Sequence, residues 1–348
     1  MFDFLFSLLS HDLGIDLGTA NTNVFVKGKG IVIRQPSVVA RHKKTKKILA
    51  IGSEAKRMEG KTPKEIEAIR PLKNGVIADF DLAEAMISYY IKKIHESRGL
   101  IPKIPRPKVV IGIPSGVTEV ERRAVQEAAL SAGARSAFLI EEPIATAIGV
   151  DIDIEAPKGS FVVDIGGGTS EIALISLGGV VVNRCLRVAG DEMDEAIVNF
   201  ARLKYGLLIG LPTAEEVKIQ IGSVYKLKKE NQTVVRGRDL ETGLPRSLKI
   251  DSEEIREALS ATVRQILGGI EEVIEEAPPE LVADILKSGI VLAGGGSQLR
   301  GLDKLVAEET KMPVWLSEDP TTCVVRGCGK LLENDRLLKK VRLVRGLR

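Results

Sequence analysis

Two stretches of the chain share a design in which an apolar strand runs through an aspartate into a turn of small residues. The first is LGIDLGTANTNVFV, residues 13–26, and the second is FVVDIGGGTSEIALI, residues 161–175. When the two are aligned, Asp16 falls on Asp164 and the two turns coincide. One such hairpin is an ordinary turn. Two of them, each at the start of one half of the chain, indicate a duplicated core.

Strand-like and helix-like patterns alternate along the rest of the chain, as is typical of α/β folds. After the strand-like KVVIGIPSG, a helix is predicted near Thr118, where Glu121 completes a capping box. A further helix is predicted over residues 144–150, with Pro143 in its first turn. Later, SGIVLAGGGSQLRGL predicts a strand, a triple glycine and a helix that begins near Ser297.

The length of 348 residues suggests about two domains with a large core. The best boundary is the Ala-Pro-Lys-Gly stretch at 156–159, directly before the second hairpin. Less regular segments within each half are predicted as insertions, and the second holds a hairpin candidate at residues 241–245. The chain is expected to cross back to the first half at its C-terminal end.

Composition narrows the function classes. With 44% apolar and 28% charged residues the chain is globular, and a net charge of +3 gives no indication of nucleic-acid binding. Cys323 and Cys328 lack the second ligand pair of a zinc site, so buried free thiols are predicted. The start has no basic region of a signal peptide, and no apolar run approaches the ~20 residues of a spanning helix. A cytoplasmic protein is therefore expected.

The small residues of the two turns suit phosphate binding, because a backbone can wrap an anion only where no side chain blocks it. Phosphates beside Asp16 and Asp164 would be repelled unless a cation intervened. Mg²⁺ fits, because it prefers oxygen ligands and keeps waters that carboxylates can hold. The alternative is a pair of plain hairpins with capping aspartates. The repetition, with AGGGS as a third glycine turn, favours phosphate binding.

Nine segments in order resemble the MreB family of bacterial actins, within the superfamily of actin, sugar kinases and heat-shock chaperones. They are IDLGTANT, EAIRPLKNGVIADF, PSGVTEVERRAV, EEPIATAIG, VVDIGGGTSEIA, GDEMDEAI, AEEVKIQIGS, LAGGGSQLRGLD and VVRGCGKLLE. The resemblance implies an actin-like α/β ATPase fold, in which two duplicated ribonuclease-H-like lobes flank a nucleotide cleft and each carries an inserted subdomain. The implied subdomains are IA (1–31, 76–150 and 320–348), IB (32–75), IIA (151–180 and 250–319) and IIB (181–249).

The resemblance also implies the roles of individual residues toward ATP or ADP and Mg²⁺. The phosphate loops would be Gly18, Thr19, Ala20 and Asn21, and Gly166, Gly167 and Gly168. Asp16 and Asp164 would hold Mg²⁺ through water. The adenosine would be contacted by Glu215, Glu216, Val217 and Lys218, and by the floor Gly294, Gly295, Gly296 and Ser297. From the residues alone, a solvated ion pair between Glu215 and Lys218 is the better explanation.

Glu142 is the candidate for orienting the attacking water, since it follows a buried strand and precedes a helix that starts with proline. Its alternative role is to stabilise the helix N-terminus. The resemblance favours the catalytic role, with Thr169 and Asp164 beside it. One residue departs from the family pattern: Asn23 stands where an apolar residue is expected.

Two apolar segments suggest membrane contact. Drawn as a helix, the N-terminus has a broad apolar face made of Phe2, Phe4, Leu5, Phe6, Leu8 and Leu9. A second apolar tip, RGLIPKIPRP, presents Leu100 and Ile101. Burial in the core is the alternative for both segments. The basic tail after Glu333 is predicted as a solvated helix, with contact to acidic lipid or a partner as the alternative.

The resemblance implies a weak ATPase that forms filaments at the inner face of the cell membrane and organises cell-wall synthesis in rod-shaped cells. Its implied partners are further copies of itself, the membrane and the wall-elongation proteins. A small-molecule kinase of the same fold remains an alternative, as does a filament ATPase of plasmid segregation or division.

Overall fold

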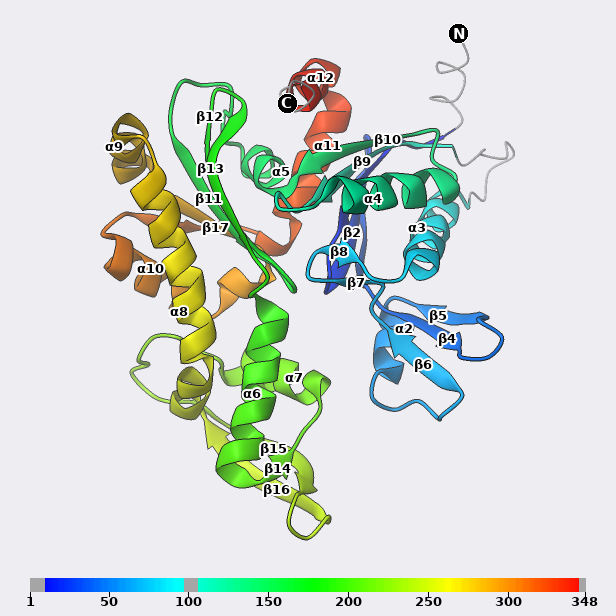
Figure 1. The fold of residues 1–348 in the computed structure, drawn as a ribbon, viewed down its shortest axis with the longest axis vertical. Coiled ribbons are helices and arrows are strands. Elements are labelled where there is room, and N and C mark those ends of the chain that lie inside the picture. The colour runs from blue at the N-terminus through cyan, green and yellow to red at the C-terminus, as the bar shows by residue number, and fades with distance from the viewer. Residues whose placement is uncertain (1–9, 97–105, 344–348) are drawn as a thin grey trace.

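The structure of the chain is a computed structural model (Figure 1). It describes residues 10–96 and 106–343. The first sheet has the strand order β10-β9-β1-β2-β3. Its strands are β1 (Leu13–Leu17), β2 (Asn21–Val26), β3 (Gly30–Pro36), β9 (Lys108–Ile113) and β10 (Ser136–Glu141). The second sheet has the order β13-β12-β11-β17-β18. Its strands are β11 (Ser160–Ile165), β12 (Ser170–Ser176), β13 (Gly179–Leu186), β17 (Ile290–Ala293) and β18 (Val314–Leu316).

The two sheets have the same topology, which confirms the duplicated core. In each, three antiparallel strands start with the predicted hairpin, and two parallel strands extend the sheet beyond the first strand. The register also repeats: Asp16 lies opposite Asn23, and Asp164 lies opposite Glu171. We call the part around the first sheet the first lobe and the part around the second sheet the second lobe.

Helices cover the outer faces of both sheets (Figure 1). The first lobe has α3 (Phe80–His95) and α4 (Glu119–Ser131), whose predicted capping box between Thr118 and Glu121 is present. Helices of the second lobe are α6 (Gly190–Tyr205), α7 (Leu211–Ile221), α8 (Ser252–Glu276), α9 (Pro279–Ser288) and α10 (Leu302–Thr310). Two short 3₁₀ helices are η1 (Gly295–Gln298) and η2 (Pro320–Thr322).

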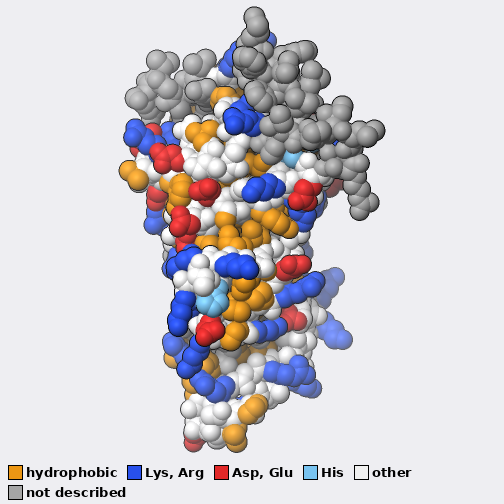
Figure 2. Space-filling model, turned by 90° about the vertical axis from the view of Figure 1, so that its right-hand side faces the viewer, with side chains coloured by type: hydrophobic (Ala, Val, Ile, Leu, Met, Phe, Trp, Pro, Cys, Tyr) orange, Lys and Arg blue, Asp and Glu red, His pale blue; other side chains and the backbone are white. Residues whose placement is uncertain are grey.

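Smaller sheets project from each lobe. The first lobe carries α2 (Ser53–Met58) and the sheet of β4 (Val39–His42), β5 (Ile48–Ile51) and β6 (Ile66–Ile69), besides the pair β7 (Leu72–Lys73) and β8 (Val76–Ile77). The second lobe carries β14 (Leu207–Leu208), β15 (Gln232–Asp239) and β16 (Pro245–Asp251). The predicted hairpin is confirmed as the turn between β15 and β16. On the face in Figure 2, Lys and Arg side chains are interspersed with Asp and Glu.

Two helices join the lobes. α5 (Glu142–Gly149) and α11 (Cys323–Glu333) lie between the sheets (Figure 1) and share a core with Val110 of the first sheet and Val162 of the second. They pack backbone to backbone, because a Cβ at Gly149 would overlap the carbonyl oxygen of Cys323 and one at Gly327 would overlap that of Ala145. The lobes are therefore fixed to each other through a contact that only glycine permits.

Two sequence predictions need correction. The helix expected near Ser297 starts at Leu302, because the Ser297 hydroxyl donates to the Gly294 carbonyl (2.7 Å) and holds a tight 3₁₀ turn first. The tail helix α12 (Asp335–Leu343) is not solvated all round, since Leu338 is buried in the core between the sheets. Cys323 and Cys328 are buried free thiols, as predicted. No helix of the described residues is long and apolar enough to cross a bilayer.

The contact between α5 and α11 generates a stability prediction. Gly327→Ala puts a methyl group against the Ala145 backbone, so the free energy of unfolding should fall by about 3 kcal/mol or more. Gly268→Ala in α8 is the matched control, because a Cβ there meets no atom within 4 Å. It should raise the stability by about 0.5–1 kcal/mol through helix propensity. Chemical denaturation measures both, and equal stabilities would contradict the packing.

Candidate functional site

A cavity of about 620 Å³ lies between the two lobes. Most residues predicted for the site line it, from both halves of the chain. They are Asp16, Gly18, Thr19, Ala20, Asn21, Glu142, Asp164, Gly166, Gly167, Gly168, Thr169, Glu215, Lys218, Gly294, Gly295 and Gly296. The fold thus brings together residues that lie up to 280 positions apart in the sequence (16 and 296).

The two glycine turns meet at the base of the cavity. A Cβ on Gly167 would lie 2.6 Å from the Ala20 Cβ, and one on Gly168 would lie 2.7 Å from the Thr19 Oγ1 atom. Side chains at these positions would push the turns apart. Because glycine leaves the backbone N–H groups accessible, the paired turns can bind an anion from two sides.

Four carboxylates converge beneath these turns. Asp16 is the last residue but one of β1, and Asp164 is the last but one of β11; both line the cavity. Burial, with a contribution from Asp164, raises the pKa of Asp16 to about 7, although the Asn23 amide opposes the shift. Burial likewise raises the pKa of Asp164 to about 6, against a hydrogen bond from the Thr146 Oγ1 atom at 2.7 Å. Each group is therefore harder to ionise than a free aspartate, because burial disfavours the charged form.

The raised pKa values make the folded state less stable as the pH rises. An acid whose pKa rises on folding binds its proton more tightly in the folded state, so ionising Asp16 costs stability that grows between pH 3.8 and about 7. A cation placed among the carboxylates reverses the preference, because it stabilises the charged forms. The buried carboxylates of the cleft therefore favour the binding of a cation near neutral pH.

Glu142 is the first residue of α5, directly after β10, and faces the cavity. Burial and the charges of Glu171, Asp16 and Asp164 raise its pKa well above the usual range. Glu171 lies behind it, buried, and accepts a hydrogen bond from the Ser115 hydroxyl at 2.5 Å. Burial also raises the pKa of Glu171. Glu142 therefore sits where it can reach a molecule in the cavity.

The donor set fits a hydrated Mg²⁺ ion. Asp16 and Asp164 place two carboxylates beside the paired turns. Within residues 10–96 and 106–343, no group of three or more His, Cys, Asp or Glu side chains is arranged to hold a metal. Mg²⁺ commonly binds through one or two carboxylates, its own waters and substrate phosphates.

The third glycine turn and α7 form the far wall of the cavity. Gly294 has φ of 79° and packs on the Ile165 backbone, where a side chain would overlap. Lys218 contacts Asp194 at 2.8 Å and donates to the Gly190 carbonyl at 2.6 Å. The ion pair between Glu215 and Lys218 that the spacing suggested is not formed, because each has a partner on another element.

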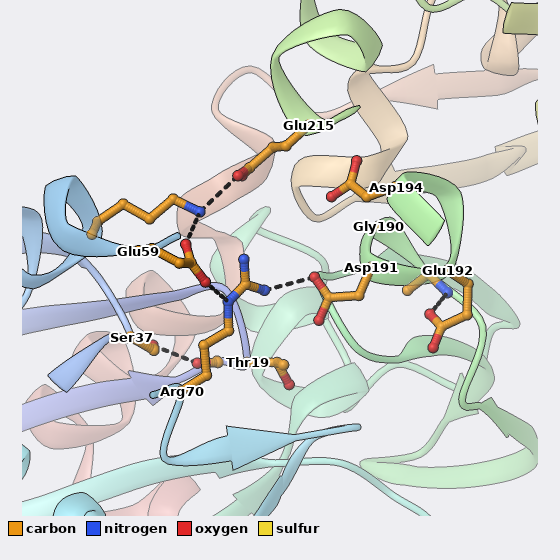
Figure 3. A network of polar contacts seen from close by, with 12 residues as sticks. Thr19, Ser37, Glu59, Arg70, Gly190, Asp191, Glu192, Asp194 and Glu215 are labelled. Carbon is orange, nitrogen blue, oxygen red and sulfur yellow. Dashed lines mark hydrogen bonds and ion pairs between the residues drawn. The ribbon is translucent and has the colours of Figure 1, made fainter. Parts of the chain in front are cut away.

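A polar network bridges the two lobes beside the cavity (Figure 3). Lys56 in α2 contacts Glu215 of the second lobe at 2.7 Å, and the Arg70 Nη1 atom contacts Asp191 at 2.7 Å. Glu59 lies between the two cations, 2.9 Å from Lys56 and 3.6 Å from Arg70. We call Lys56 and Arg70 with their two acidic partners the interlobe pairs.

Three predicted residues do not line the cavity. Val217 is buried in the core of the second lobe, Glu216 is exposed and accepts from Gln220, and Ser297 is buried in its 3₁₀ turn. Successive helix residues point about 100° apart, so only part of a four-residue helical run can face one ligand. The predicted membrane residues (Phe2, Phe4, Leu5, Phe6, Leu8, Leu9, Leu100 and Ile101) lie outside the described residues.

Sequence reasoning missed several polar residues of the site. Asp191 and Asp194 lie at the start of α6 and line the cavity, within the GDEMDEAI segment. Glu171 gave a readable signal, because it directly precedes the apolar run at 172–175, whereas Asn23 stands out only against the family pattern. Lys56 and Arg70 gave none, since their contacts depend on how the lobes meet.

Comparison with known proteins identifies the family. The family model for MreB/Mbl protein matches residues 10–340. The cell shape-determining protein MreB of Escherichia coli is 50% identical over 330 residues, 94% of each chain. The cell shape-determining protein Mbl of Bacillus subtilis is 47% identical over 334 residues, 96% of this chain and 99% of that protein.

Solved structures agree with this result. The crystal structure of MreB5 of Spiroplasma citri bound to ADP has a TM-score of 0.88 at 37% identity, over 95% of this chain and 98% of that one. A structure described as a MamK double helical filament has a TM-score of 0.78 at 26% identity, over 93% and 99% of the two chains. The actin-like fold expected from the sequence is thereby confirmed, and the chain belongs to the MreB/Mbl family.

Proposed function

We propose that this protein binds and slowly hydrolyses ATP and assembles into actin-like filaments that determine cell shape. The observation that carries the proposal is the pair of equivalent glycine turns that meet beneath a 620 Å³ cavity beside Asp16 and Asp164. Related structures support it, since MreB5 of Spiroplasma citri is described as bound to ADP and to AMPPNP. Filament assembly is supported by the likeness to the MamK filament.

In this proposal, the N–H groups of residues 18–21 and 166–168 bind the phosphates from opposite sides. Asp16 and Asp164 hold hydrated Mg²⁺, which would supply charge compensation for the phosphates. Glu215 and Lys218 contact the nucleoside above the floor formed by Gly294, Gly295 and Gly296. Glu142 orients the attacking water, and Thr169 assists it. Positioning and charge compensation contribute more to phosphoryl transfer than a strong base does.

We further propose that the chain divides into the four subdomains defined above, with the interlobe pairs between IB and IIB. The filaments would lie in the cytoplasm at the inner face of the cell membrane and organise the wall-elongation proteins. Complementation of a rod-shape-deficient bacterium would test this cellular role, and round cells despite normal expression of the protein would contradict it.

The role of Glu142 predicts a separation of binding from hydrolysis. Glu142→Gln should leave the affinity for Mg²⁺-ATP nearly unchanged and slow phosphate release by about 100-fold or more, because an amide does not replace the carboxyl group that orients the water. Fluorescent-nucleotide binding and phosphate release measure the two quantities. Glu275→Gln, on the exposed side of α8, is the control. Unchanged turnover in Glu142→Gln would remove Glu142 from the mechanism.

The interlobe pairs generate a prediction about assembly. If ATP favours polymer by closing the lobes, the double variant Lys56→Ala/Arg70→Ala should raise the critical concentration several-fold, since each pair contributes up to about 1 kcal/mol to closure. Sedimentation in ATP at increasing protein concentration gives this value. Arg184→Ala is the control, because it loses ion pairs to Glu272 and Glu276 within the second lobe.

The sedimentation results distinguish the role of the interlobe pairs from filament assembly itself. An unchanged critical concentration in the double variant would exclude the interlobe pairs from closure while leaving assembly intact. A wild-type protein that never sediments with ATP would overturn the filament proposal and favour the small-molecule kinase.

The apolar segments of the sequence predict a membrane anchor. Filaments should float with anionic vesicles in a density gradient. Deletion of residues 1–10 with Leu100→Ser and Ile101→Ser should abolish vesicle binding but not polymerisation, because many weak anchors add avidity only along a filament. The same deletion with Leu100 and Ile101 retained is the matched control. Vesicle binding that persists in the full variant would shift the anchor to the basic tail after Glu333.

A further inference from the structure

Asn23 is a buried polar residue on the central hairpin of the first lobe. It lies in β2 directly opposite Asp16 in the register of β1 and β2, and the residue is 5% exposed. Its Nδ2 atom donates to the Asp16 Oδ2 atom at 3.1 Å and to the Thr321 carbonyl at 3.0 Å. Both partners are acceptors, so the NH₂ group and not the amide oxygen must face them. The orientation of the amide is therefore determined by its surroundings.

Thr321 belongs to the segment by which the chain crosses between the lobes. This segment, residues 317–322, follows β18 of the second sheet and leads into α11, which packs against both sheets. The Pro320 carbonyl accepts from the Gly294 N–H group at 2.9 Å, which ties the segment to the second lobe. Asp319 contacts Arg34, the residue opposite Asn23 on β3, at 3.0 Å. Asn23 thus links Asp16 to a segment that is held from both lobes.

The two aspartates of the cavity are held in corresponding ways. Asp16 accepts from Asn23 through its Oδ2 atom, and Asp164 accepts from the Thr146 hydroxyl through its own Oδ2 atom. Among the described residues, no donor reaches the Oδ1 atom of either carboxylate. Each side chain is therefore fixed through one oxygen, and the other oxygen remains for a ligand in the cavity.

We propose that Asn23 is a positioning residue that fixes the Asp16 carboxylate for a hydrated Mg²⁺ ion bound with nucleotide. This proposal rests on the proposed function. A neutral donor suits the task, because a lysine in the same place would pair with Asp16 and replace the cation. An apolar residue, which the family pattern predicts here, would leave both Asp16 Oδ2 and the Thr321 carbonyl without their donor. Asn23 fixes the carboxylate and leaves its charge available.

The test is a Mg²⁺ titration of the binding of a fluorescent, non-hydrolysable ATP analogue. In Asn23→Leu, the Mg²⁺ concentration for half-maximal binding should rise about 10-fold, as is common when a residue that orients a metal ligand is lost. The affinity for the analogue in EDTA should stay at the wild-type value, which a general disturbance of the fold would not allow. Asn23→Ser, too short to reach both acceptors, should give the same shift if the leucine variant does not fold.

Two controls define where the effect arises. Asn199→Leu changes the same residue type at an exposed position of α6 and should leave the titration unchanged. Arg34→Ala removes the ion pair between β3 and Asp319 of the crossing segment but keeps the donor to Asp16, so it should also leave the Mg²⁺ requirement unchanged. An equal shift in Arg34→Ala would overturn the proposal, because the effect would then come from the crossing segment.

The remaining outcomes distinguish this proposal from the proposed function. If wild type binds the analogue in a Mg²⁺-dependent way and Asn23→Leu gives the same curve, Asn23 has no positioning role and the proposed function stands. If Asn23→Leu loses binding equally with and without Mg²⁺, the residue is structural and the proposal fails. If wild type binds no nucleotide under any condition, the proposed function itself fails.

Discussion

The rest of the structure depends on the burial of four carboxylates at one point between the lobes. Asp16, Glu142, Asp164 and Glu171 come from three different strands and the start of a helix, and each has its pKa raised by burial. Such a group of like charges costs folding stability that grows toward neutral pH. A cation bound there would offset this cost, and the paired glycine turns supply the anion site that would accompany it.

Glycine contacts make this convergence possible at two levels. Between α5 and α11, Gly149 and Gly327 let the backbones touch, which sets the distance between the two sheets. At the ends of the strands, Gly167 and Gly168 let the two hairpin turns meet. Polar links then join the lobes from Asn23 to Thr321 and from Arg70 to Asp191. The lobes are therefore held together by the backbone packing of α5 on α11 and by the half-buried interlobe pairs.

Much of the site could be predicted from sequence because its chemistry lies at strand ends. A strand fixes the direction of a residue such as Asp164 through its alternation, and the following glycine turn is visible as composition. Helical runs were less informative: Glu215 and Lys218 line the cavity, whereas Glu216 and Val217 between them do not. The family pattern marks the whole run, but the rotation of 100° per residue decides which members reach a ligand.

The sequence by itself determined the duplicated α/β core, the two glycine hairpins and the acidic residues near the ends of their first strands, because local periodicity and turn chemistry carry that information. The tertiary structure alone decided which side chains meet. Asn23 is visible in the sequence only as a departure from the family pattern, and only the β1–β2 register and the crossing of the chain at Thr321 give it two partners. Lys56 and Arg70 likewise acquire their partners across the cleft, because contacts between lobes depend on long-range packing that no local pattern encodes.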